Sequence, residues 1–162
     1  MSQWFAIIDG AADARLYDLI SKTRNHACLY TGDYDAETRK ALPYVVEMRN
    51  GETFSQTWSQ HESGRSWGIL CRTSLTLTNL RRHLRHFTTA RLPDGQVVMF
   101  RFWDPRVFKT FVEEGEENEV APIFKGIELI VADYGVKGRR HYKWQDGLRF
   151  SDTANSPANV SA

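Results

Sequence analysis

Four aspartates, Asp9, Asp33, Asp35 and Asp104, are the residues of this chain best suited to metal-dependent chemistry. Carboxylate oxygens are the ligands that Mg²⁺ prefers, and a bound metal ion can activate water for hydrolysis. Asp9 follows an apolar run that reads as a strand, a position where catalytic acids often lie in α/β folds. Asp9 followed by Gly10 is equally typical of a simple turn, and no motif brings the four acids together. A metal-dependent hydrolase using Asp9 and Asp104 therefore stays an alternative.

A second cluster of residues is cationic. Arg81, Arg82, His83, Arg85 and His86 lie opposite an apolar stripe in a segment with helical periodicity. Such a face could contact phosphates, dock an acidic protein, or simply be solvated. The chain has 21 Lys and Arg against 20 Asp and Glu, so its net charge does not favour nucleic acid. We therefore expect Arg81, Arg82 and Arg85 to bind a protein partner, and a nucleic-acid-binding module using this helix stays a second alternative.

No nucleophilic or cofactor-binding motif accompanies these charges. Ser63, Ser66 and Ser74 have no Gly-x-Ser-x-Gly context, and the sequence has no glycine-rich phosphate loop. Cys28 and Cys71 lie in apolar runs, where burial raises the pKa of a thiol and makes it a poor nucleophile. The absence of a catalytic set favours a binding protein, and we expect no cofactor and no metal. No apolar run has membrane-spanning length and no secretory signal is present, so we expect a cytoplasmic location.

The stretch at residues 96–107 is the most informative of the elements that must position these groups. Residues 96–103 follow a Pro-Asp-Gly turn and are rich in β-branched and aromatic side chains, which predicts a buried strand. Asp104 is a good N-cap for a following helix, and Pro105 fits its first position. Arg101 and Arg106 interrupt this apolar stretch. We expect a buried structural network in which one of these arginines pairs with Asp9 or Asp104.

The remaining pattern predicts strands alternating with helices in one layered domain of the α/β or α+β class, with a mixed sheet flanked by helices. Expected strands are residues 4–9, 26–30, 43–48, 67–71 and 127–131, with short polar strands within 134–150. Expected helices are residues 12–21, 77–87 and 104–112, together with a helix that carries Phe54 and Trp58 on one face. The acidic run 113–119 predicts a solvated, mobile connection. The domain is expected to span residues 1–150, and residues 151–162 to form a disordered tail.

Tryptophans are candidate anchors for a partner because the chain is rich in aromatic residues. Trp67 and Trp103 lie in apolar runs and are expected to face the core. Trp58 and Trp144 have polar neighbours in the sequence, so we expect these two at an interface.

Several of these segments, read in order, resemble a known family. They are residues 4–11 (WFAIIDGA), 28–32, 42–46, 67–70, 80–85, 93–95 and above all 100–107 (FRFWDPRV). This series is similar to the effector-adaptor domain of type VI secretion, the Tap or Tec chaperone family, over residues 4 to about 125. Many relatives carry a further helical lobe, which we expect to be absent or vestigial in this chain.

The resemblance implies a cytoplasmic chaperone that binds a toxin effector and helps to load it onto the VgrG spike. It also implies that the protein catalyses no reaction. In this interpretation Asp9, Arg101, Trp103, Asp104, Pro105 and Arg106 form a structural signature that holds the fold together.

Overall fold

A seven-stranded antiparallel sheet forms the centre of the protein. The computed structural model describes residues 1–153. The strands of the sheet are β1 (Gln3–Asp9), β2 (His26–Cys28), β3 (Pro43–Glu47), β4 (Gly68–Thr73), β7 (Ile127–Asp133), β8 (Arg139–Trp144) and β9 (Leu148–Thr153). Their order is β2-β3-β1-β4-β7-β8-β9, and every neighbouring pair runs antiparallel. The predicted α+β class is confirmed.

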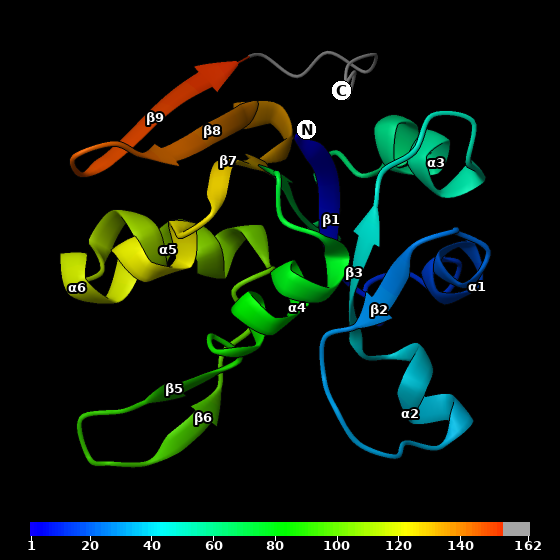
Figure 1. The fold of residues 1–162 in the computed structure, drawn as a ribbon, viewed down its shortest axis with the longest axis horizontal. Helices are drawn as coiled ribbons and strands as arrows, with labels where there is room; N and C mark the ends of the chain where they lie inside the picture. Colours follow the sequence, from blue (N-terminus) through cyan, green and yellow to red (C-terminus); the bar gives the residue numbers. More distant parts are fainter. Residues whose placement is uncertain (154–162) are drawn as a thin grey trace.

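Helices cover both faces of this sheet, as Figure 1 shows. One side carries α1 (Leu16–Ser21) and α3 (Thr53–His61), and the other carries α4 (Leu77–Arg85), α5 (Pro105–Glu114) and α6 (Glu117–Val120). The short helix α2 (Ala36–Lys40) follows β2, and the 3₁₀ turns η1 (Ala121–Phe124) and η2 (Gly135–Lys137) flank β7.

Each face of the sheet has its own apolar core because neighbouring strand residues point to opposite sides. In β1, Phe5 and Ile7 pack with α4 and α5, whereas Ala6 and Ile8 pack with α1 and α3. All four are at most 2% exposed. The alternation explains why β1 reads as a continuous apolar run: it is buried on both faces.

The segment at residues 96–103 differs from the predicted buried strand. Its ordered part is short: β6 (Val97–Met99) pairs with β5 (Thr89–Arg91) in a two-stranded hairpin that is separate from the main sheet. In Figure 1 this hairpin extends away from the rest of the molecule below α4. The chain then turns, and only Phe102 and Trp103 are buried, at 0% and 2% exposed. Apolar composition predicted burial correctly for these two rings and wrongly for the strand before them.

Two further expectations from charge and composition were wrong. The acidic run at 113–119 is mostly helical, because α5 extends to Glu114 and α6 begins at Glu117. A disordered tail was expected from residue 151, but residues 151–153 belong to β9 and pair with β8. The rest of that expected tail, residues 154–162, lies outside the described residues.

The central pair of strands depends on Gly68. Gly68 lies opposite Ile8 across the β1–β4 ladder, and a Cβ added there would lie 2.0 Å from the carbonyl oxygen of Ile7. No side chain could move to relieve this contact, because the opposing atom belongs to the backbone of β1.

We therefore expect Gly68→Ala to lower the free energy of unfolding by about 3 kcal/mol, as overpacking of a rigid site does. Urea unfolding measures this change. The matched control is Gly95→Ala, where the added Cβ meets open space and only the positive φ of +87° disfavours alanine. We expect this control to lower the free energy of unfolding by about 1 kcal/mol. Equal midpoints for the two variants would contradict the steric argument.

Candidate functional site

The Asp104 side chain begins α5. Its carboxylate accepts hydrogen bonds from the backbone N–H of Arg106 at 2.9 Å and from the Arg106 guanidinium at 3.0 and 2.7 Å. Pro105 occupies the first turn, so the predicted cap is confirmed. Burial alone would raise the pKa of Asp104, but the hydrogen bonds from Arg106 outweigh it and hold this pKa below its usual value.

Asp9 has a similar double role at the end of β1. One carboxylate oxygen accepts from the backbone N–H of Ala11 at 2.9 Å, and the other accepts from the Arg101 guanidinium. The predicted pairing of an arginine with Asp9 or Asp104 is therefore confirmed for both acids. The expectation that these pairs are buried was wrong, because the side chains of Arg101 and Arg106 are 56% and 76% exposed.

The aromatic part of the signature is the buried part. Trp103 packs edge-on against Phe102 at 5.2 Å and against Tyr30 at 6.0 Å between ring centroids. Tyr30 follows β2, so the contact joins the start of α5 to the far edge of the sheet. Trp103 thus has the inward-facing role that its apolar context predicts.

The cationic helix does not present its charges on one free face. The Arg81 side chain donates to the carbonyl oxygen of Cys28 at 2.5 Å, and Arg85 donates to the hydroxyl of Thr31 at 3.0 Å. These two arginines therefore tie α4 to the end of β2. Arg82 is exposed and bonds only Asn79 of its own helix, at 3.3 Å. Of the three arginines predicted to bind a partner, Arg82 is the one that forms no hydrogen bond with another element in the described part of the chain.

The two predicted tryptophan anchors differ in burial. Trp58 is 1% exposed and packs between Phe54 at 6.1 Å and Trp67 at 6.2 Å, so its expected interface position was wrong. Trp58 is buried because the face of α3 that carries Phe54 and Trp58 packs against the sheet. The polarity of neighbouring residues in the sequence does not predict this packing. Trp144 is half-buried beside Phe124, and its role as an anchor stays a prediction.

Sequence reasoning missed the exposed apolar side chains of the β5–β6 hairpin. Leu92, Val97 and Met99 are 40%, 55% and 56% exposed. Val97 and Met99 lie on one face of the hairpin, opposite Arg91 and Thr89 of β5. The turn sequence was recognised, but nothing local distinguishes a hairpin that leaves the sheet from a strand inside it.

A buried ionic triad was missed as well. Arg139 of β8 donates to Glu62 at 3.1 Å and to Asp133 at 3.0 Å, and all three side chains are at most 10% exposed. Asp133 also accepts from the backbone N–H groups of Gly64 and Gly135, at 3.2 and 2.8 Å. The triad joins the end of α3 to β7 and β8. Glu62 is far from Asp133 and Arg139 in the sequence, and the three residues form no motif.

The triad carries two acids for one arginine. Burial, followed by the proximity of Asp133, raises the pKa of the Glu62 carboxyl to about 8, although Arg139 opposes the shift. At neutral pH a proton is therefore held within the triad.

A second polar network joins α5 to β8 and β9. Glu113 accepts from the Tyr142 hydroxyl at 2.8 Å and from Arg140 at 2.7 Å, and Arg140 also donates to Asp152 at 2.6 Å. The Tyr142 hydroxyl is in turn 2.7 Å from that of Tyr134. Burial raises the pKa of both tyrosines, so they stay neutral.

A cleft of about 370 Å³ lies beside this network, between the first turn of α5, η2 and β8. Three of its four cationic side chains are already paired, and the fourth, Lys137, forms no ion pair with a described residue. Arg106 pairs with Asp104, Lys109 with Glu113, and Arg140 with Asp152. The cleft therefore has little net charge with which to select a ligand.

The geometry gives the metal-hydrolase alternative no support. Within residues 1–153, no three His, Cys, Asp or Glu side chains are grouped so that they could hold a metal ion. Asp9 and Asp104 each face a guanidinium, which disfavours a cation. Burial raises the pKa of the thiols of Cys28 and Cys71, and the two are not joined by a disulfide. No helix in the described part of the chain could cross a membrane.

Removal of single arginines should separate the exposed pairs from the buried triad. We expect Arg101→Ala and Arg106→Ala each to lower the free energy of unfolding by no more than about 1 kcal/mol, because both side chains are largely exposed. Arg139→Ala should lower the free energy of unfolding by about 3–5 kcal/mol, because it leaves two buried acids without their cation. Chemical denaturation measures all three, and equal losses would contradict this division.

Glu62→Gln should change the pH dependence of stability. The raised pKa means that the folded chain binds more protons than the unfolded chain between pH 4.5 and about 8. Wild-type stability should therefore fall as pH rises through that window, by up to about 1.4 kcal/mol per pH unit, and level off above it. The glutamine amide mimics the protonated acid, so the slope should flatten, and the variant should exceed the wild type in stability near pH 8.5. Parallel curves from urea titrations would contradict this assignment.

Comparison with known proteins gives one match. No curated protein and no solved structure matches the chain. The sequence matches the family described as "Domain of unknown function (DUF4123)" over residues 4–121, from β1 to the start of η1. The match covers well over half of the protein and includes the hairpin and the Trp-Asp-Pro-Arg segment. The chain therefore belongs to this family of unknown function.

Proposed function

We propose that this protein is a cytoplasmic chaperone or adaptor that binds a toxin effector of type VI secretion and helps to load it onto the VgrG spike. The order of motifs from residue 4 to the Trp-Asp-Pro-Arg segment supports the assignment, and the family match covers the same residues. The observation that carries the binding role is the β5–β6 hairpin, which exposes apolar side chains away from the core.

The hairpin is anchored at one end and free at the other. Phe100, which follows β6, packs against Phe111 of α5 at 5.0 Å between ring centroids, and its backbone N–H donates to the carbonyl of Thr88 at 2.8 Å. Beyond this base, Val97 and Met99 are more than half exposed. An isolated two-stranded hairpin is only marginally stable in water, and exposed apolar side chains grouped on one element indicate a surface that another protein covers.

Exposed cations lie on and beside the hairpin. Arg91 lies on β5 and Arg101 follows the hairpin, and both are exposed. An apolar centre with a charged rim is the usual composition of a protein-binding surface, and the rim contributes to partner choice. Methionine suits such a surface because its flexible side chain adapts to different partners.

Co-expression with a candidate toxin tests the proposed function. We expect the toxin to be recovered in soluble form in a stable complex with the tagged chain, and its loading onto VgrG to depend on that complex. A toxin that is soluble and reaches VgrG equally well without this protein would contradict the proposal.

The hairpin can be tested separately with Val97→Ser and Met99→Ser combined. Loss of two apolar contacts at the centre of an interface should weaken toxin binding about tenfold or more, with little change in unfolding temperature because both side chains are exposed. Val136→Ser removes an equally apolar and fully exposed side chain from η2 and serves as the control. Titration calorimetry measures the affinities. Equal binding by the hairpin variant and the control would exclude the hairpin as the contact surface.

A further inference from the structure

The strand β9 ends the seven-stranded sheet with an open edge. Its six residues pair with β8 without interruption, and neither a bulge nor a proline occurs in them. Within residues 1–153, no strand pairs with the outer side of β9. Exposed edges of this length invite pairing with another chain, and proteins usually block them.

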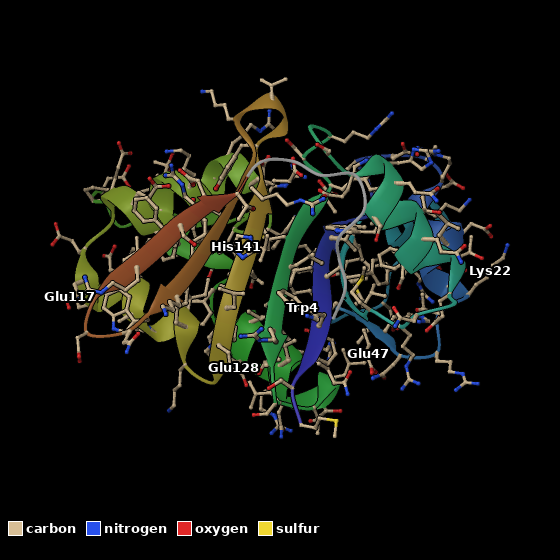
Figure 2. All side chains as sticks on the ribbon, turned by 90° about the horizontal axis from the view of Figure 1, so that it is seen from above. Trp4, Lys22, Glu47, Glu117, Glu128 and His141 are labelled. Carbon is tan, nitrogen blue, oxygen red and sulfur yellow. The ribbon has the colours of Figure 1, made fainter. Side chains whose placement is uncertain are left out.

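Beside this edge, part of one sheet face is open. Tyr142 and Phe150 point toward α5, so their neighbours His141, Lys143 and Arg149 point to the other face. Figure 2 looks onto that face: α1 and α3 lie to the right, and no helix of the described chain covers β7, β8 and β9 on the left, where His141 is labelled.

Two cations lie directly opposite each other on the open face. Lys143 of β8 and Arg149 of β9 are cross-strand partners, and both are exposed. Like charges in this position destabilise a sheet because their Cβ atoms are only about 5 Å apart. Neither side chain forms an ion pair with any described residue.

These cations border a shallow groove of about 300 Å³. It is lined by Leu129 and by five residues of β8 and β9: His141, Lys143, Arg149, Phe150 and Ser151. The groove, the unpaired charges and the open strand edge are therefore next to one another.

We propose that the edge of β9 docks an extended, acidic segment of a partner polypeptide. The segment adds a further strand to the sheet through backbone hydrogen bonds with β9, and its carboxylates lie beside Lys143 and Arg149. The inference rests on the proposed protein-binding function and names the chemistry of the cargo segment. The site lies beyond the residues of the family match, which end at 121.

Charge and geometry select this occupant over others. A second copy pairing through β9 would add two more cations to the joined sheet without neutralising the first pair, because the one acid of β9, Asp152, is already paired with Arg140. Residues 154–162 contain no Asp or Glu side chain that could neutralise the two cations. A nucleic acid could supply negative charge, but it has no backbone that continues a β-ladder, whereas an acidic peptide satisfies both requirements.

A labelled peptide that alternates Glu with Val over the length of β9 is the probe. Fluorescence anisotropy with the purified full chain should detect binding that weakens as salt is added. Lys143→Glu combined with Arg149→Glu should weaken it about tenfold or more. Lys125→Glu with Lys137→Glu makes the same change in net charge at exposed sites elsewhere and should leave binding unchanged.

Two altered peptides separate strand addition from charge attraction. A peptide with Lys in place of Glu should not bind, and one with Pro in place of Val should lose binding because it cannot form a ladder. The proposal is overturned if the wild type does not bind the acidic peptide, or if the double variant binds it as the wild type does. It is also overturned if the proline peptide binds equally.

Other occupants give distinct results. Tighter binding of single-stranded DNA of the same charge, lost in the double variant, would assign the surface to nucleic acid and overturn the proposal. A dimer in sedimentation that the double variant changes would assign the edge to a second copy. If the double variant does not fold, Lys143→Gln with Arg149→Gln replaces it. Because the peptide assay contains no toxin, its failure is distinguishable from a failure of toxin binding.

Discussion

The packing of Phe102 and Trp103 beside the Asp104 cap is the contact on which the rest of the structure depends. The two buried rings hold the start of α5 against the sheet, and the cap gives the helix its direction. Glu113, near the other end of α5, then holds β8 through Tyr142 and Arg140. The β5–β6 hairpin precedes the same segment, so one anchored helix positions both exposed regions to which we assign partner contacts.

Charge has two different uses in this protein. At the surface, Arg101 orients Asp9, which caps the turn after β1. Arg106 orients Asp104, which caps the first turn of α5. In the interior, Arg139 balances two acids where α3 meets β7 and β8. The surface pairs are screened by water and contribute little energy, whereas the buried triad retains a proton because its desolvated acids outnumber the cation. Neither arrangement leaves a free carboxylate beside an open position for a metal ion.

The two proposed contact surfaces differ in chemistry and in their relation to the family. The hairpin is apolar with a cationic rim and lies inside the matched residues, so a contact that family members share is expected there. The β9 edge is cationic, offers unsatisfied backbone groups and lies outside the match. Under the two proposals the hairpin supplies an apolar contact to the cargo and the β9 edge an acid-selective one, so the cargo is recognised at two chemically different surfaces.

Local patterns in the sequence determined where several strands and helices lie, because their formation depends on neighbouring residues. Short apolar runs located β1, β3 and β4, the apolar stripe located α4, and Asp104 followed by Pro105 located the start of α5. Tertiary packing decided the rest. It buried Trp58 despite its polar neighbours, and it left Val97 and Met99 exposed despite their apolar run. It also brought Glu62 to Asp133 and Arg139, which lie in a distant part of the chain. The physical reason is that propensity and capping act over a few residues, whereas burial depends on which elements stack against each other across the sheet.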